Sequence, residues 1–237
     1  MFKVIDKNIR LDEESHIYSH SKYPKTDFIS VTSLLKPYFE PFNSMEIATD
    51  LCNNNYKYIG RKPEELIQEW NNSRDLGTEI HAQIEHYIRD NKKPTETKAK
   101  NAVKWLNKYG KSMDLQFLPE VIVYSTDLSV AGTIDLLSYD SFTDSYEIID
   151  WKSNKKINKR SFGGKMGIDP ITFDLEDCNY NHYALQLSLY RYLLEKYYDI
   201  VISNQKIVHL TEKRCNSIDT PYYKDHIIKI INNKQEI

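Results

Sequence analysis

Residues 117–153 contain three apolar stretches that alternate in the two-residue period of β-strands, and this region constrains the fold most. The first two strands are expected to meet at a short turn near residues 126–129. The second strand, Val130–Leu137, is followed by a turn at residues 140–145 and then by the third strand, YEIIDWKS. Short turns join antiparallel neighbours, so the sequence predicts a three-stranded meander.

Helices are predicted on both sides of this meander. One is expected to begin at Ser73 or Asp75 and to run to about Asp90, with a buried stripe of Leu76, Ile80, Ile84 and Ile88 at four-residue steps. A second is expected over Thr97–Tyr109, with Gly110 as its C-terminal stop. After an irregular segment at about 154–178, we expect an apolar helix over Asn181–Tyr197, a strand over Ile200–Leu210 and a polar C-terminal helix.

The N-terminal part is predicted to add a hairpin and short helices. Residues 1–31 alternate apolar and polar side chains around turn-rich tracts. Thr32 is the expected cap of a helix that ends near Pro37. Residues 41–70 are expected to be helical in pieces, with Pro63 in the first turn of one helix.

Together these elements predict an α/β fold with a central mixed β-sheet flanked by helices, an N-terminal hairpin and helical additions. No Pro/Gly/Ser linker interrupts the 237 residues, so we expect a single domain. Its expected parts are the N-terminal hairpin and helical region (1–72), the core (73–210) and a C-terminal helix (211–237).

Composition excludes several protein classes. A chain that is 40% hydrophobic and 28% charged is typical of a globular protein, and a net charge of −2 excludes a binder that coats nucleic acid by bulk charge. Three scattered cysteines without a CxxC pair indicate neither a disulfide framework nor a structural zinc site. Because no apolar run has the length of a signal peptide or membrane span, we expect a soluble, intracellular protein without membrane contacts. A Lys, Asn, Ile and Tyr bias suggests a viral or phage source, hence host-cell cytoplasm.

Two of the predicted strands carry charged side chains where core residues are expected. Asp150 and Lys152 point to one face of their strand and Trp151 to the other. Asp135 lies in the apolar strand before it, and pairing across the intervening turn would bring it near Asp150. Two adjacent carboxylates repel each other, and a divalent cation would relieve that repulsion. Oxygen ligands of this kind suit Mg²⁺ or Mn²⁺. A plain salt pair between Asp150 and Lys152 is the alternative.

Two helices add polar residues at four-residue spacing. His81 and Glu85 share a face beside the isoleucine stripe. Gln186 and Tyr190 share a face of the apolar helix, where a buried glutamine needs partners. Glu85 could equally be solvated, and Tyr190 could belong to the core.

A basic segment follows the Asp–x–Lys strand directly. The stretch KSNKKINKR, residues 152–160, carries five positive charges, and no acidic residue occurs from Trp151 to Ile168. We expect Lys155, Lys156, Lys159 and Arg160 to bind a polyanion and steer it to the carboxylates. A solvated loop is the alternative. The chain lacks GxxxxGK[ST], so a nucleotide cofactor is not expected.

The order of these residues resembles the RecB-like exonuclease branch of the PD-(D/E)xK nuclease superfamily. Its four motifs are matched by Gly77…His81, Gly132…Asp135, Asp150–Trp151–Lys152 and Gln186…Tyr190. Glu120 matches a glutamate often found in the strand before the second motif. The resemblance spans about residues 73–197, and the layout is similar to that of phage members and mitochondrial genome-maintenance exonucleases. One departure is Ile134, which stands where proline often precedes the aspartate.

The resemblance implies a restriction-endonuclease-like core and a role for each motif. Asp135, Asp150 and the backbone carbonyl of Trp151 would hold one Mg²⁺ or Mn²⁺, with His81 as a nitrogen ligand. Lys152 would orient or help deprotonate the attacking water. Glu85 or Glu120 would lie near any second metal, and Gln186 and Tyr190 would support the site or touch the DNA.

The expected function is therefore a metal-dependent DNA nuclease. An exonuclease acting on single strands or ends in replication, recombination or repair is favoured. The alternatives are a non-catalytic DNA-binding or recombination-accessory module on the same fold, and a structure-specific or restriction-type endonuclease.

Overall fold

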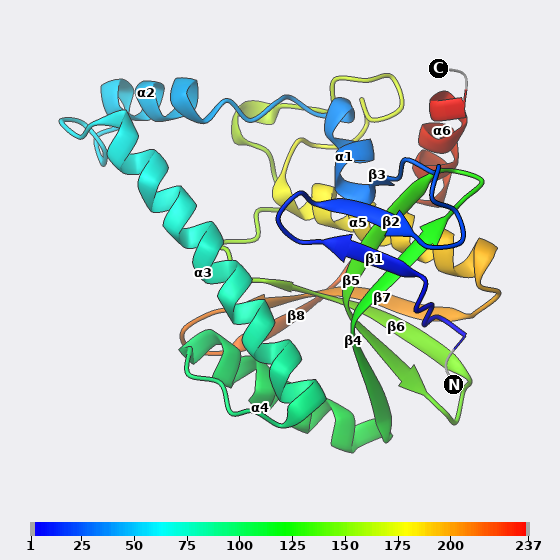
Figure 1. Ribbon diagram of the computed structural model, residues 1–237. Coiled ribbons are helices and arrows are strands. Elements are labelled where there is room, and N and C mark those ends of the chain that lie inside the picture. Colours follow the sequence, from blue (N-terminus) through cyan, green and yellow to red (C-terminus); the bar gives the residue numbers. More distant parts are fainter. Residues whose placement is uncertain (1–2, 236–237) are drawn as a thin grey trace.

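The β-sheet at the centre of the molecule is mixed, as the sequence predicts. The computed structural model describes residues 3–235, and within them six strands form this sheet (Figure 1): β3 (Ile29–Ser30), β4 (Leu115–Ser125), β5 (Val130–Asp140), β6 (Ser145–Lys152), β7 (Ile202–Leu210) and β8 (Cys215–Asp219). Strands β4, β5 and β6 are the predicted antiparallel meander. Strand β6 pairs with β7 in parallel, which requires the crossover through α5 (Asn179–Tyr197).

Strand β5 organises the sheet because it pairs along both edges. One edge is occupied by β4 along its whole length. The other is shared by β3, which pairs in parallel at Val130 and Ala131, and by β6, which pairs with residues 136–140. The meander and the crossover therefore place the C-terminal end of β6 beside the middle of β5.

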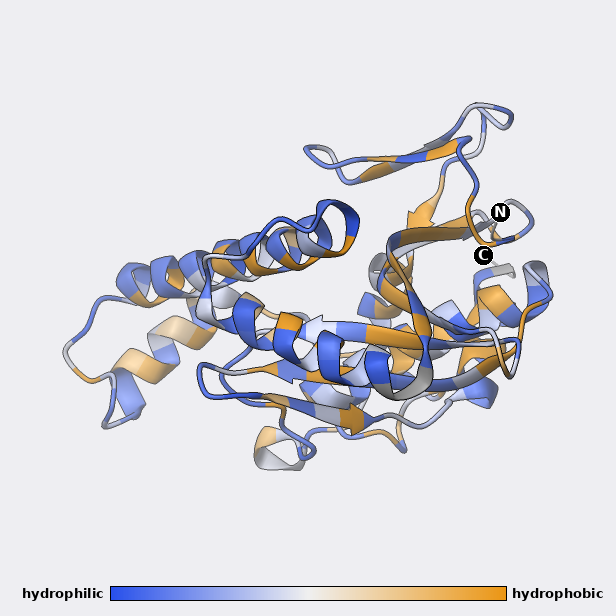
Figure 2. Ribbon diagram, turned by 90° about the horizontal axis from the view of Figure 1, so that it is seen from below, coloured by the Kyte–Doolittle hydropathy of each residue, from blue (hydrophilic) through white to orange (hydrophobic). Residues whose placement is uncertain are grey.

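Helices cover the two faces of the sheet. Helices α3 (Pro63–Asp90) and α4 (Thr97–Met113) pack on one face, where Ile80, Ile84 and Leu106 contact Ile149 and Trp151. The other face is covered by α5 together with two shorter helices, α1 (Val31–Leu35) and α6 (Lys224–Gln235). Figure 2 shows this layering, with apolar strand segments between helices whose outer faces are polar. The α/β class and the flanked mixed sheet are thus confirmed.

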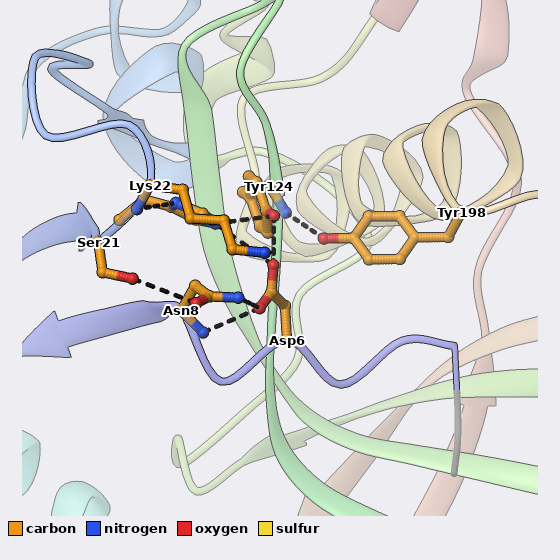
Figure 3. A network of polar contacts seen from close by, with 7 residues as sticks. Asp6, Asn8, Ser21, Lys22, Tyr124 and Tyr198 are labelled. Carbon is orange, nitrogen blue, oxygen red and sulfur yellow. Dashed lines mark hydrogen bonds and ion pairs between the residues drawn. The ribbon is translucent and has the colours of Figure 1, made fainter.

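The predicted hairpin is confirmed as β1 (Ile9–Asp12) and β2 (Ile17–His20). A partly buried polar network ties it to the sheet (Figure 3). The Tyr124 hydroxyl of β4 donates to Asp6 Oδ2 at 2.6 Å, and His20 Nε2 lies 3.0 Å from the same hydroxyl. The Lys22 amide donates to His20 Nδ1 at 3.1 Å, which leaves the ring proton on Nε2. The network extends to α5 through Tyr198, whose hydroxyl accepts from the Tyr124 amide.

The predicted start of the helix at Ser73 or Asp75 is wrong. Helix α3 is continuous from Pro63, so the PEELIQEW helix and the following one are a single element. The Ser73 hydroxyl donates to the Glu69 carbonyl inside the helix instead of capping a new one. Leu76 was expected in the buried stripe but is 42% exposed, whereas Ile80 and Ile84 are buried and Ile88 is partly buried against the same core.

Smaller corrections concern helix ends. The cap of α1 is Ser30, not Thr32, since its side chain accepts from the Ser33 amide. Helix α4 continues through Gly110 and ends at Asp114, whose φ of 50° forms the left-handed cap. A Cβ at Gly110 would lie 2.9 Å from the Phe117 ring, so this glycine allows close packing and does not stop the helix.

The remaining elements are short or peripheral. They are a 3₁₀ turn at Lys36–Tyr38, helix α2 (Ser44–Asn54) and a 3₁₀ turn at Phe162–Gly164. The C-terminal part contains not only the expected helix, now α6, but also the edge strand β8, which the sequence did not indicate. None of the helices within residues 3–235 is both long and apolar enough to cross a lipid bilayer.

Candidate functional site

Three carboxylates lie in a row across β4, β5 and β6. Pro119 pairs with Leu136 and Val121 with Ile134, which leaves Glu120 opposite Asp135. On the other edge of β5, Leu136 pairs with Ile149 of β6. In this antiparallel register, Asp135 and Asp150 are the residues next to this pair, so they face each other across the two strands. The Trp151 amide donates to Asp135 Oδ2 at 2.8 Å, which fixes this carboxylate against β6. The predicted approach of Asp135 to Asp150 is therefore observed.

Glu120 has a backbone conformation that strands rarely contain. Its φ is 50°, in the left-handed region, between extended neighbours in β4. The irregularity shifts the side-chain alternation of the strand by one residue. As a result Leu118 and Val121, three residues apart, both pack into the α5-side core. Glu120 itself is left facing the aspartates.

The lysine of the Asp–x–Lys pair faces its aspartate. Lys152 Nζ lies 2.7 Å from Asp150 Oδ2, and both side chains are largely buried, at 16% and 3% exposure. The same Nζ lies 4.5 Å from the centre of the Tyr183 ring on α5. Among the residues that the structure describes, Asp150 Oδ2 has no hydrogen-bond partner apart from this ion pair. Trp151 points to the opposite face, into the α3–α4 core, as the alternation predicts.

Crowding of negative charge changes the ionisation of the row. Burial, together with the neighbouring Asp135 and Glu85 carboxylates, raises the pKa of Glu120 to about 8. Burial likewise raises the pKa of Asp150 to about 6, with Asp135 adding to the shift and Lys152 opposing it. Burial would lower the pKa of Lys152, but the charges of Asp150 and Asp135 outweigh it and raise that pKa above its usual value. The row therefore has an unfavourable excess of negative charge.

Helix α3 brings His81 to the row. His81 Nδ1 lies 3.6 Å from Asp135 Oδ2. One turn earlier, a Cβ at Gly77 would be only 3.0 Å from the Ser153 hydroxyl, so the absence of a side chain lets α3 approach the end of β6. In this chain the glycine allows the helix to pack closely on the end of β6, and His81, four residues later, then lies beside Asp135.

Glu85 lies one turn beyond His81 and is paired within its own helix. Its Oε1 is 2.7 Å from Arg89 Nε. Its charge nevertheless adds to the rise in the pKa of Glu120. Within the described residues, neither Glu85 nor Glu120 makes a hydrogen bond to Asp135 or Asp150.

Helix α5 supplies the floor of the site. Gln186 Nε2 donates to the Tyr190 hydroxyl at 3.2 Å, and Tyr190 is buried. A Cβ at Gly132 would lie 2.5 Å from the Tyr190 ring, so this glycine lets α5 pack directly on β5. Burial raises the pKa of Tyr190 well above its usual value, and the Asp150 and Asp135 charges add to the effect. Tyr190 therefore lies beneath the carboxylates as a protonated phenol.

Tyr183 was missed by the sequence analysis. It lies three residues before Gln186, on the same face of α5, and its ring contacts the Lys152 ammonium. The signal that could have found it is this three- and four-residue spacing of Tyr183, Gln186 and Tyr190.

The basic segment after β6 is exposed but only partly free of partners. Lys155 and Lys156 are exposed, and the charge of Lys155 acts on Glu69 of α3. Lys159 lies over the Tyr180 ring, 4.9 Å from its centre. Arg160 forms an ion pair with Glu176. Of the four predicted anion-binding residues, Lys155 and Lys156 are thus the most available.

The side chains of the row are chemically suited to a hard divalent cation. Carboxylate oxygens are the ligands that Mg²⁺ and Mn²⁺ prefer, and added positive charge would relieve the repulsion within the row. Within residues 3–235, no three His, Cys, Asp or Glu side chains are gathered tightly enough to hold a metal ion in their present positions. The Asp150 and Asp135 oxygens are instead engaged by Lys152, the Trp151 amide and His81.

Two solved structures resemble this chain loosely. No protein-family model and no curated protein matches the sequence. Among solved structures, SSO0001 aligns with a TM-score of 0.40 and 14% identity over 88% of this chain and 75% of that one. A protein from Eubacterium rectale called a "Putative exonuclease" aligns with a TM-score of 0.42 and 11% identity over 96% of this chain and 83% of that one.

Proposed function

We propose that the protein is a metal-dependent DNA nuclease that hydrolyses phosphodiester bonds, acting as an exonuclease on single strands or strand ends. The observation that carries the proposal is the row of Glu120, Asp135 and Asp150, with Lys152 paired to its last member. Such an arrangement is costly for a structural core, because buried like charges repel. It is useful where a cation and a phosphate must be bound together.

Asp135, Asp150 and the Trp151 carbonyl are the proposed cation ligands, with His81 as a nitrogen ligand. Support comes from Asp150 Oδ2, which is buried and has only Lys152 as a partner, and from His81, which already lies beside Asp135. A bound Mg²⁺ or Mn²⁺ would neutralise phosphate oxygens and lower the pKa of a bound water. Glu120 and Glu85 are the residues proposed to border a second cation.

Lys152 is the proposed catalytic cation of the chain itself. Asp150 and the Tyr183 ring hold its ammonium at the end of β6, where the basic segment begins. There it can orient the attacking water and stabilise the charge that develops on the phosphate. Gln186 and Tyr190 hold α5 against β5 and support the floor on which the aspartates rest.

Cleavage assays on labelled single- and double-stranded DNA, with Mg²⁺ or Mn²⁺, test the proposal. Asp150→Asn and Lys152→Ala should each reduce cleavage at least about 100-fold, as loss of one group that stabilises developing charge typically does. Lys206→Ala is the matched control, since Lys206 is also a buried strand lysine paired with a glutamate and placed over a tyrosine ring. This control should cleave at close to the unmodified rate. No cleavage by the unmodified chain with any divalent metal would refute the proposal.

Substrates labelled at the 5′ or the 3′ end separate the possible modes of action. Progressive loss of nucleotides from one end is the expected result for an exonuclease. Discrete fragments from closed circular DNA would instead indicate an endonuclease. Salt-dependent binding without turnover would indicate a non-catalytic DNA-binding module. A role in replication, recombination or repair would follow from an end-directed activity.

A further inference from the structure

An apolar groove borders the site beside the first half of α5. It lies between the segment that contains α1 and the following turn and the first half of α5, and its volume is about 720 Å³. Leu35, Pro37, Phe39 and Leu185 form its apolar lining, and Tyr183 and Gln186 line it as well. Because Tyr183 contacts Lys152, the groove adjoins the end of β6.

Aromatic side chains lie in or beside the groove between Trp70 of α3 and Lys152. The Phe42 ring, which lines the groove, is 5.6 Å from the Trp70 ring of α3. The Phe39 ring lies 4.2 Å from the His182 ring. Tyr183, which also lines the groove, has the Lys152 ammonium over its ring. Aromatic faces in such an arrangement can stack on planar groups of a ligand.

The charges at the rim of the groove are positive in sum, because Glu40, the carboxylate in its lining, is ion-paired with Lys165. Lys36 is exposed and lines the groove itself. The basic segment with Lys155 and Lys156 begins just beyond Lys152, and the charge of Lys155 acts on Glu69, one residue from Trp70. Apolar rings between cations match a ligand with flat apolar faces and a polyanionic backbone, which describes an unpaired nucleic-acid strand.

Phe42 is the residue best placed to receive a base. Its side chain is 70% exposed although it belongs to the groove wall, whereas Phe39 is buried in the floor. In a duplex the faces of the bases are covered by their stacked neighbours, so only an unpaired strand offers them to a side chain.

We propose that this groove is a base-stacking subsite for unpaired nucleotides next to the phosphate that reaches Lys152, with Phe42 and Tyr183 as the stacking residues. This inference rests on the proposed function, since it names the substrate form that the same site accepts. Such a subsite would make binding of a nucleic-acid strand depend on its bases as well as on its phosphates.

Equilibrium binding in EDTA tests this subsite separately from cleavage. The probes are a fluorescent single-stranded oligothymidylate and the same oligonucleotide with three consecutive abasic nucleotides. Phe42→Ala should weaken binding of the base-bearing strand about 5- to 100-fold, the range for loss of one base–aromatic stack, and should change binding of the abasic strand little. Phe142→Ala is the matched control, because Phe142 is 95% exposed on the β5–β6 turn, outside the groove lining.

The outcomes distinguish the two proposals. Base-dependent binding that Phe42→Ala removes supports the subsite even if the chain cleaves nothing, and in that case only the nuclease proposal fails. Cleavage together with equal affinity for abasic and base-bearing strands overturns the subsite and leaves the nuclease intact. Equal effects of Phe42→Ala and Phe142→Ala, or no binding of either oligonucleotide, also overturn it.

Discussion

At the scale of single residues, the site is defined by carboxylates that the fold holds in unfavourable ionisation states. Glu120 is the clearest case, because burial and the neighbouring Asp135 and Glu85 charges raise its pKa from 4.5 to about 8. A carboxyl with a raised pKa in the folded chain keeps its proton where the unfolded chain has lost it. Its contribution to stability is therefore complete below about pH 4.5 and is lost as the pH rises through 8.

Glu120→Gln should consequently stabilise the metal-free chain at high pH. In EDTA at pH 8 we expect the free energy of unfolding to exceed that of the unmodified chain by on the order of 2 kcal/mol, since one pKa unit corresponds to about 1.4 kcal/mol and neighbouring groups share the shift. At pH 4.5 the difference should be small. Urea unfolding at both pH values measures it, with Glu212→Gln, an exposed glutamate, as the control. An equal gain at both pH values would contradict this account of Glu120.

At the scale of elements, the long helix α3 joins two parts with different packing. Its C-terminal half packs through Ile80 and Ile84 into the core beneath the sheet. Its N-terminal half packs with α2 in a separate small cluster that includes Leu66, Ala48 and Cys52. In Figure 1 this arm of α2 and α3 extends away from the sheet. A separate cluster of this size predicts an arm that opens more easily than the body.

Leu66→Ala should therefore loosen the arm without unfolding the body. A leucine truncated in a packed cluster costs about 2–5 kcal/mol, so hydrogen exchange over residues 44–70 should accelerate on the order of 30-fold or more. Ile84→Ala, in the same helix but in the main core, is the matched control and should lower the thermal midpoint of the whole chain. Faster exchange throughout β5 and α5 in the Leu66 variant would show that arm and body unfold as one unit.

Sequence patterns predicted those elements whose periodicity is strong. The meander and the β7 strand were predicted because apolar alternation and turn residues agree there. The start of α3 was missed because Ser73 can bond back inside a helix as readily as it can cap one. Strand β8 was missed because the sequence CNSID is short and polar, as an edge strand can be.

The candidate site was predictable where it depends on strand geometry. The meeting of Asp135, Asp150 and Lys152 follows from side-chain alternation and a short turn. The left-handed backbone at Glu120 and the groove beside Tyr183 could not be predicted in this way. Both depend on how α1, α3 and α5 pack around the sheet, which no local pattern specifies.

At the scale of the whole molecule, positive charge is concentrated although the net charge is −2. The four cations at 155–160 all follow β6, but they are unequal. Arg160 is paired with Glu176, and Lys159 lies over the Tyr180 ring. Lys155 and Lys156 are exposed, and neither forms an ion pair with an acidic side chain among the described residues. These two lysines should therefore contribute most to binding a polyanion.

Lys155→Ala/Lys156→Ala should weaken binding of single-stranded DNA and make it less sensitive to salt. Each phosphate contact on a single strand contributes about 0.7 to the slope of log affinity against log salt, so the slope should fall by about 1.4. Arg160→Ala should change the slope less, because its charge is already compensated by Glu176. Fluorescence anisotropy titrations between 50 and 200 mM salt, roughly the range over which counterion release is resolved, measure both effects.

Lys108→Ala/Lys111→Ala on α4 is the control for this last comparison, since it removes the same charge from exposed positions far along the chain from β6. If binding depends on the local field at the end of β6, this control keeps nearly the full salt slope. If both double variants reduce the slope equally, the strand is bound diffusely over the surface. The concentration of charge after β6 would then have no part in directing DNA to the carboxylates.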